Sequence, residues 1–153
     1  MKYILTMLLC AGILVHMQAQ DSTKQSMKDI LDSKHFEFEP ISMTSAHGKF
    51  RHVDGGYFLL INGDTLKTYL PYTGRAYNAS FGSSEAGFDF TSTDYTYSVS
   101  EGKKKKYTVE AKIKDRMYNA EFTLTVYDDG TAYLRAYSSD REAVSYNGSV
   151  KMK

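Results

Sequence analysis

The sequence predicts an all-β protein: a single antiparallel β-sandwich or open barrel of about eight or nine short strands, with one short N-terminal helix. Tyrosine and phenylalanine, which favour pleated and half-buried surfaces, number 13 and 8, and tryptophan is absent. After Phe36, apolar and polar residues alternate with a period of two. The connectors between these runs are too short for the crossovers of about a dozen residues that parallel strands need, so the sheet is predicted to be antiparallel.

The first residues have the layout of a secretory leader. Lys2 gives a positive start, an apolar run follows over residues 3–15, and Ala19 is a small residue near the end of the segment. The run is shorter than the roughly 20 apolar residues that span a bilayer. We therefore predict a cleavable signal peptide over residues 1–19 and a single antiparallel β domain over residues 20–153.

Export implies a periplasmic or cell-envelope location, and release into the medium is a further possibility. Lipid anchoring at Cys10 is an alternative, but Leu8 and Leu9 stand where small residues would be expected. Because Cys10 is the only cysteine, cleavage leaves a chain without disulfides that depends on its core.

The remaining composition limits the kinds of partner. The net charge of +1 provides no general field for nucleic acid or anionic membranes, so neither is predicted as a partner. No later apolar stretch reaches membrane length, and no cofactor motif is present. The oligomeric state is left open.

Residues 21–35 form the one segment with a helical pattern. Met27, Ile30 and Leu31 are spaced three and four residues apart, which gives a narrow apolar stripe. Ser22 or Thr23 can accept hydrogen bonds from the first-turn amides. We expect a short helix that lies on the outside or at the end of the domain.

Strands are expected wherever the alternation recurs between turn residues. Pro40 implies an edge or bend in the first strand, and Asn62-Gly63 predicts a tight hairpin with a type I′ turn. A structured loop is expected over residues 72–84, and Gly148 is expected to mark a bulge. The alternating segments are 36–43, 49–53, 57–61, 64–70, 87–92, 95–99, 107–114, 120–127, 131–137 and 143–152.

Two boxes carry a family resemblance. The first reads LPYTGRAY over residues 70–77, and the second reads REAVSYNG over residues 141–148. Together they resemble the LPYxGRAY and RxxxSYxG boxes of family 4251 among the domains of unknown function, whose members are exported proteins of Gram-negative bacteria. The resemblance covers nearly the whole mature chain. It implies a β-rich envelope protein and transfers no activity.

The same boxes supply the candidate ligand-binding residues. Arginine offers a planar fork of donors and tyrosine a rigid face with a hydroxyl, which together suit a carboxylate, a sugar or a peptide backbone. A structural tie between the long loop and the last strand is the alternative interpretation. The residues concerned are Tyr72, Arg75, Tyr77, Arg141 and Tyr146, with Ser145 beside them.

Other groupings are better explained by structure than by chemistry. His35, His47 and His52 lack the spacing of a zinc site. Lys103–Lys106 reads as a solvated turn. The carboxylate pairs at 37/39 and 128/129 fit a polar strand face and a hairpin turn better than acid–base catalysis.

Three functional hypotheses follow. The first is a non-enzymatic module that binds a small ligand or a peptide. The second is an adaptor that docks to an envelope assembly through a strand edge. The third is an enzyme of unrecognised type. No catalytic residue or metal site is predicted.

Overall fold

The computed structural model describes residues 26–75, 77, 87–115 and 119–153. The predicted leader, Ser22, Thr23 and most of the predicted 72–84 loop beyond Arg75 lie outside these residues. The described part contains one short helix and ten strands, and it confirms the predicted all-β class. The elements are α1 (Met27–Asp32), β1 (His35–Ser45), β2 (Phe50–His52), β3 (Phe58–Asn62), β4 (Thr65–Leu70), β5 (Phe88–Ser92), β6 (Tyr95–Gly102), β7 (Lys106–Ile113), β8 (Ala120–Tyr127), β9 (Thr131–Ser138) and β10 (Arg141–Met152).

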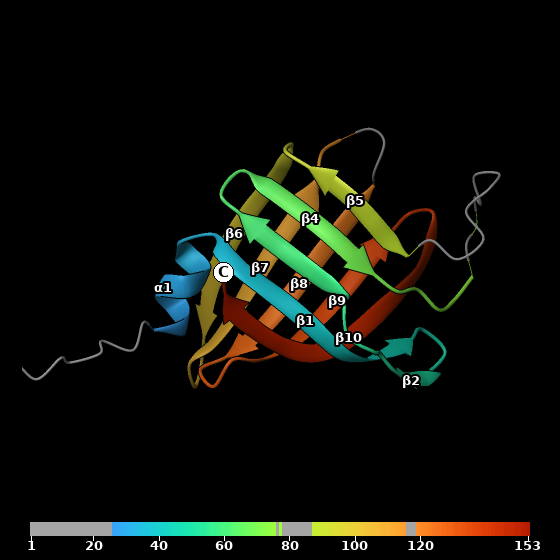
Figure 1. The fold of residues 1–153 in the computed structure, drawn as a ribbon, viewed down its shortest axis with the longest axis horizontal. Helices are drawn as coiled ribbons and strands as arrows, with labels where there is room; N and C mark the ends of the chain where they lie inside the picture. The colour runs from blue at the N-terminus through green and yellow to red at the C-terminus, as the bar shows by residue number, and fades with distance from the viewer. Residues whose placement is uncertain (1–25, 76, 78–86, 116–118) are drawn as a thin grey trace, which may run out of the picture.

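The strands form one curled sheet, and each of the pairings between them is antiparallel. Nine strands follow the order β5-β4-β3-β1-β10-β9-β8-β7-β6 and build a half-barrel (Figure 1). The tenth, β2, pairs with β1 outside this path. It occupies the same side of β1 as β3 does, further along the strand: β3 pairs with residues 35–38 and β2 with residues 42–44.

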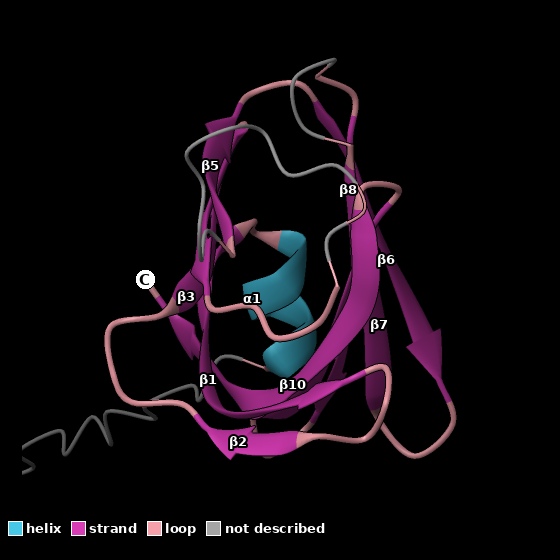
Figure 2. Ribbon diagram, turned by 90° about the vertical axis from the view of Figure 1, so that its right-hand side faces the viewer, coloured by secondary structure: helices cyan, strands magenta, loops and turns pink. Residues whose placement is uncertain are grey.

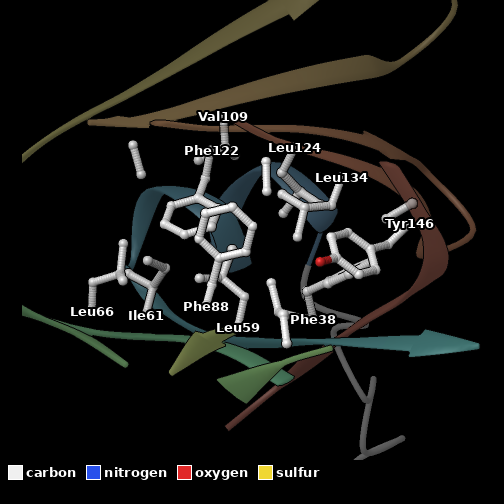
Figure 3. Packing of buried hydrophobic residues seen from close by; sticks show 14 of the residues in the cluster. Phe38, Leu59, Ile61, Leu66, Phe88, Val109, Phe122, Leu124, Leu134 and Tyr146 are labelled. Carbon is white, nitrogen blue, oxygen red and sulfur yellow. The ribbon is translucent and has the colours of Figure 1, made fainter. Parts of the chain in front are cut away.

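The core lies on the concave side of this sheet because successive side chains point to opposite faces. In β8, Phe122, Leu124 and Val126 are buried, whereas Thr123 is exposed. Figure 3 shows Phe122 and Leu124 among the inward side chains, with Phe88 of the opposite wall against Phe122. The period-two pattern of the sequence thus translates directly into one buried face.

The helix closes one end of the half-barrel. Figure 2 looks along the curl of the sheet and shows α1 between its two walls. Leu31 is fully buried, and its carbonyl accepts a hydrogen bond of 2.7 Å from the Tyr97 hydroxyl of β6. The helix begins later than predicted, with Ser26 as its N-cap in a capping box with Asp29. No helix in the described residues has the length and apolar character needed to cross a bilayer.

No bulge lies at Gly148, where one was predicted: the register shifts opposite it on β1, and on β10 itself it shifts between Arg141 and Val144. Pro40 pairs with Gly148 and Ser42 pairs with Asn147, so Ile41 is the extra residue. Gly148 is needed for a different reason: a Cβ atom there would stand 2.0 Å from the Glu39 carbonyl oxygen. The glycine therefore permits close approach of the two backbones opposite the bulge.

The β3–β4 hairpin is confirmed, but its turn is one residue later than predicted. Asn62 pairs with Thr65, so Gly63 and Asp64 are the central residues. Gly63 has a φ of +59°, while Asp64 has no positive φ, which excludes a type I′ turn. Gly63 also donates its amide to the Lys34 carbonyl, and this bond fixes the turn beside the end of α1.

Candidate functional site

The two sequence boxes meet in space. Tyr146, which is fully buried, donates its hydroxyl to the Pro71 carbonyl at 2.6 Å. Arg141 Nη1 donates to the Gly87 carbonyl at 3.0 Å. Burial raises the pKa of Tyr146 far above its ordinary value, so the phenol stays a donor. Figure 3 shows its ring beside Phe38 and Leu134 in the core.

The Arg141 guanidinium also packs on aromatic rings. It lies 5.1 Å from the ring centre of Tyr72 and 5.2 Å from that of Phe88, which are cation–π distances. Tyr72 meets Phe88 edge to face and donates its hydroxyl to the Arg75 carbonyl at 2.8 Å. Burial is the main cause that raises the pKa of the Tyr72 phenol. Tyr72 is therefore held at three points.

The segment after Tyr72 is tied to the start of β10 through its backbone. Glu142 N donates to the Arg75 carbonyl at 3.1 Å, and Tyr77 N donates to the Asp140 carbonyl at 2.8 Å. The Glu142 carboxylate accepts from Arg75 N at 3.3 Å and lies 3.0 Å from His47 Nε2. The hydrogen bond from the Arg75 amide, followed by that with His47, holds the pKa of Glu142 below its usual value.

These contacts decide which predicted residues are brought together. Tyr72, Arg141 and Tyr146 form one contact network, with bonds directed at backbone carbonyls. Arg75 takes part through its backbone, and its side chain is exposed; Tyr77 is 62% exposed. The tie between loop and last strand, which was the alternative interpretation, thus has a direct structural basis. Whether these residues also bind a ligand stays a prediction.

A cleft opens beside this tie. It lies between the projecting residues 46–56, here called the β2 arm, and the ends of β4 and β5, and its volume is about 440 Å³. Small-molecule sites commonly measure about 300–1,000 Å³. The lining residues are Met43, Arg51, His52, Val53, Asp54, Tyr57, Tyr69, Leu70, Pro71, Tyr72, Gly87 and Asp89.

Two tyrosines form an aromatic wall in the cleft. The rings of Tyr57 and Tyr69 are stacked, with centres 5.0 Å apart and planes 22° apart. Tyr69 belongs to the outward face of β4, and its cross-strand partner on β5 is Asp89. Arg51 is the cross-strand partner of the buried Met43, so it points to the concave side of the sheet.

The sequence did not single out Tyr57, Tyr69, Arg51 or Asp89 as site residues. Three of them occupy strand positions that alternation alone assigns to a face without showing what lies opposite. Only Tyr72 belongs both to the predicted set and to the cleft. The Asp54-Gly55-Gly56 turn before Tyr57 was the one local signal in this region.

No metal-binding group is present in the part of the chain that the structure describes: no three His, Cys, Asp or Glu side chains come together there. The three histidines lie apart. His47 contacts Glu142, His35 Nδ1 lies 2.6 Å from the Ser33 carbonyl, and His52 meets Phe50 edge to face. Glu37 and Glu39 flank the buried Phe38 and form ion pairs with Lys153 and Lys151.

Comparison with known proteins supports the fold and the family. A DUF4251 family protein from Bacteroides eggerthii has a similar crystal structure, with a TM-score of 0.63 and 17% sequence identity over 80% of this chain and 83% of that one. No curated protein matches the sequence. The model of the family described as "Domain of unknown function (DUF4251)" matches residues 18–150, which confirms the predicted family. The chain belongs to the DUF4251 family.

Proposed function

We propose that this protein is an exported, non-enzymatic binding module of the bacterial envelope that holds a small ligand or a peptide in the cleft beside the β2 arm. The observation that carries the proposal is the cleft itself, which combines a stacked tyrosine pair with charged side chains from different strands. Concave sites with aromatic walls and a few convergent polar groups are the usual form of ligand pockets.

The two boxes take a positioning role in this proposal. Arg141 and Tyr146 bind the carbonyls of Gly87 and Pro71, and both of these residues line the cleft. Tyr72 contacts the ligand directly, while Arg75 and Tyr77 fasten the adjoining segment to β10. Loss of the tie would therefore distort one wall of the cleft.

The strand-edge adaptor is the second hypothesis, and the structure favours it less. Of the two edge strands, β5 has only five residues. The other edge, β6, is next to α1: the Tyr97 hydroxyl donates to Leu31, and the Lys34 ammonium lies 5.2 Å from the centre of the Tyr97 ring. These contacts place α1 beside β6 at Tyr97, and a helix beside an edge strand hinders strand addition there.

A binding screen tests the proposal, using the chain produced by export in a bacterial host. The probes are a synthetic hexapeptide library and an array of defined oligosaccharides. We expect binding that Tyr69→Ala weakens about tenfold or more, because an aromatic anchor is lost. Tyr137→Ala is the matched control, since Tyr137 is 46% exposed on β9 and Tyr69 is 44% exposed on β4. Equal binding by wild type and Tyr69→Ala, or no binding at all, would contradict the proposal.

Export is tested separately by cell fractionation and N-terminal sequencing of the recovered protein. The leader pattern of residues 1–19 supports a product that begins at Gln20 and lies outside the cytoplasm. An uncleaved chain in the cytoplasm would contradict export, and a product beginning at a lipidated Cys10 would show anchoring in its place.

A further inference from the structure

The polar side chains of the cleft include both donors and acceptors without internal partners. Among the described residues, the side chains of Arg51, Asp54 and Asp89 make no hydrogen bond or ion pair, and neither do the hydroxyls of Tyr57 and Tyr69. Guanidinium offers only donors, carboxylates offer only acceptors, and phenols offer both. A ligand in this cleft therefore finds both hydrogen-bond donors and hydrogen-bond acceptors.

The charges of the cleft disfavour strongly ionic ligands. The lining is of mixed sign: an anion placed there would meet the Arg51 guanidinium but also the carboxylates of Asp54 and Asp89, and a cation would meet these carboxylates but also the guanidinium. Like charges at short range oppose binding, and they do so more strongly where water is partly excluded. A neutral ligand with many hydroxyl groups avoids both conflicts and can use every one of these groups.

The aromatic wall adds a preference for ring-shaped ligands. The stacked Tyr57 and Tyr69 rings support each other, and tyrosine provides a rigid contact surface with little loss of conformational entropy. A sugar ring has a C–H-rich face that packs on an aromatic ring, while its edge hydroxyls donate and accept hydrogen bonds. The C–H-rich face of a sugar can thus pack on the tyrosine rings, while its hydroxyls bond to the polar lining residues.

From these observations we infer that the cleft binds a neutral oligosaccharide. The inference rests on the proposed binding function and names its ligand class. Tyr69 stacks on a sugar ring, while Arg51 donates to sugar oxygens and Asp89 accepts from sugar hydroxyls. A second hollow of about 290 Å³ shares Val53 and Tyr57 with the cleft, which gives a chain of more than one sugar room to continue.

The test is an oligosaccharide array that presents neutral, uronic-acid and free amino sugars, followed by calorimetric titration with the best neutral glycan. We expect neutral glycans to bind, with affinity unchanged within about twofold between 50 and 500 mM salt, because screening acts only on charge–charge attraction. Tyr69→Ala should weaken binding about tenfold or more, and Tyr137→Ala should leave it unchanged.

Two substitutions at charged positions sharpen the test. Arg51→Met removes the donors and should weaken binding about fivefold or more. Asp89→Asn keeps an acceptor oxygen without the charge, so a neutral glycan should lose less than about threefold, whereas a cationic ligand would lose far more. Circular dichroism of each variant verifies that the sheet is intact.

The outcomes separate the inference from the function on which it rests. Preference for charged sugars, or affinity that falls steeply with salt, would overturn the neutral-saccharide inference. Tyr69-dependent binding of hexapeptides without glycan binding would also overturn it and leave the proposed binding function in place. Binding of no probe, or binding that Tyr69→Ala does not change, would contradict both.

Discussion

The Tyr146 hydroxyl shows how a single buried donor joins two distant parts of the chain. It lies in the core, and its acceptor is the carbonyl of Pro71 at the end of β4. Tyr146→Phe would keep the ring and leave that carbonyl without this donor. We expect it to lower the free energy of unfolding by about 1–3 kcal/mol in urea titrations.

Tyr133→Phe is the control for this prediction. The Tyr133 hydroxyl also forms a hydrogen bond, to Ser145 Oγ at 2.6 Å, but the residue is exposed on the outer face. Its replacement should change the stability by less than about 0.5 kcal/mol. Equal effects of the two substitutions would show that the buried hydrogen bond contributes no more to the stability than the exposed one.

Gly148 gives a second prediction at the scale of single residues. Because a Cβ atom at this position would stand 2.0 Å from the Glu39 carbonyl oxygen, Gly148→Ala forces β1 and β10 apart. We expect a loss of about 3 kcal/mol in the free energy of unfolding, measured by chemical denaturation. Gly55→Ala, where nothing lies within 4 Å of the added Cβ, should be nearly neutral, and a neutral Gly148→Ala would refute the close approach.

Among the elements, the β1–β2 turn is fastened to the start of β10 by the carboxylate of Glu142. Its hydrogen bonds with Arg75 N and His47 favour the charged form and lower its pKa from the usual 4.5. A lowered native pKa means that this stabilisation is complete above the unfolded value and is lost as the pH falls through the native value. The stability advantage of wild type over Glu142→Gln should therefore shrink from about pH 5 downward.

Thermal unfolding of both proteins between about pH 3 and pH 6 measures this difference, because carboxyl groups titrate in this range. Glu110→Gln is a suitable control, since Glu110 is exposed on β7 and forms no hydrogen bond or ion pair with the described residues. A constant gap between wild type and Glu142→Gln across this range would contradict the role assigned to the carboxylate.

The helix α1 acts as the end cover of the half-barrel, and Leu31 is its buried side chain. Leu31→Ala should leave a cavity in the core and lower the free energy of unfolding by about 2–5 kcal/mol. Lys28→Ala removes only an exposed ion pair with Asp32 and should leave the stability nearly unchanged. If both variants unfold at the same denaturant concentration, the helix is dispensable for the core.

The strands could be predicted because the alternation of apolar and polar residues lies within each strand's own sequence. In β8, for example, Phe122, Leu124 and Val126 are the apolar residues that become buried. The bulge at Ile41 could not, because it depends on how closely β1 approaches Gly148 in another strand. The cap of α1 was misplaced for a related reason: several residues before Met27 can cap a helix, and tertiary packing decides which one does.

The candidate site divides in the same way. The meeting of the two boxes could be predicted from their composition, since a long loop needs partners for its polar groups. The cleft could not, because Arg51, Tyr69 and Asp89 come together only through the strand order β5-β4-β3-β1 and the position of β2 outside it. Strand order is a property of the whole sheet, and no single segment encodes it.

At the scale of the whole molecule, the two ends of the half-barrel have different roles. Figure 1 shows α1 at one end and β2 at the other, with the long strands β1 and β10 between them. The helix end is covered by α1 with its buried Leu31, while the β2 end carries the cleft and the tie between the boxes. This asymmetry places the proposed binding function at the end that the helix leaves open.

The most direct test of this assignment is chemical-shift mapping of the ¹⁵N-labelled protein during titration with the best neutral glycan from the array. The largest amide shifts should cluster at Arg51–Asp54, Tyr57, Tyr69, Tyr72 and Asp89, and they should saturate with the same affinity as the calorimetric binding. Shifts confined to the outer face of β8 and β9, or to α1 and β6, would contradict it.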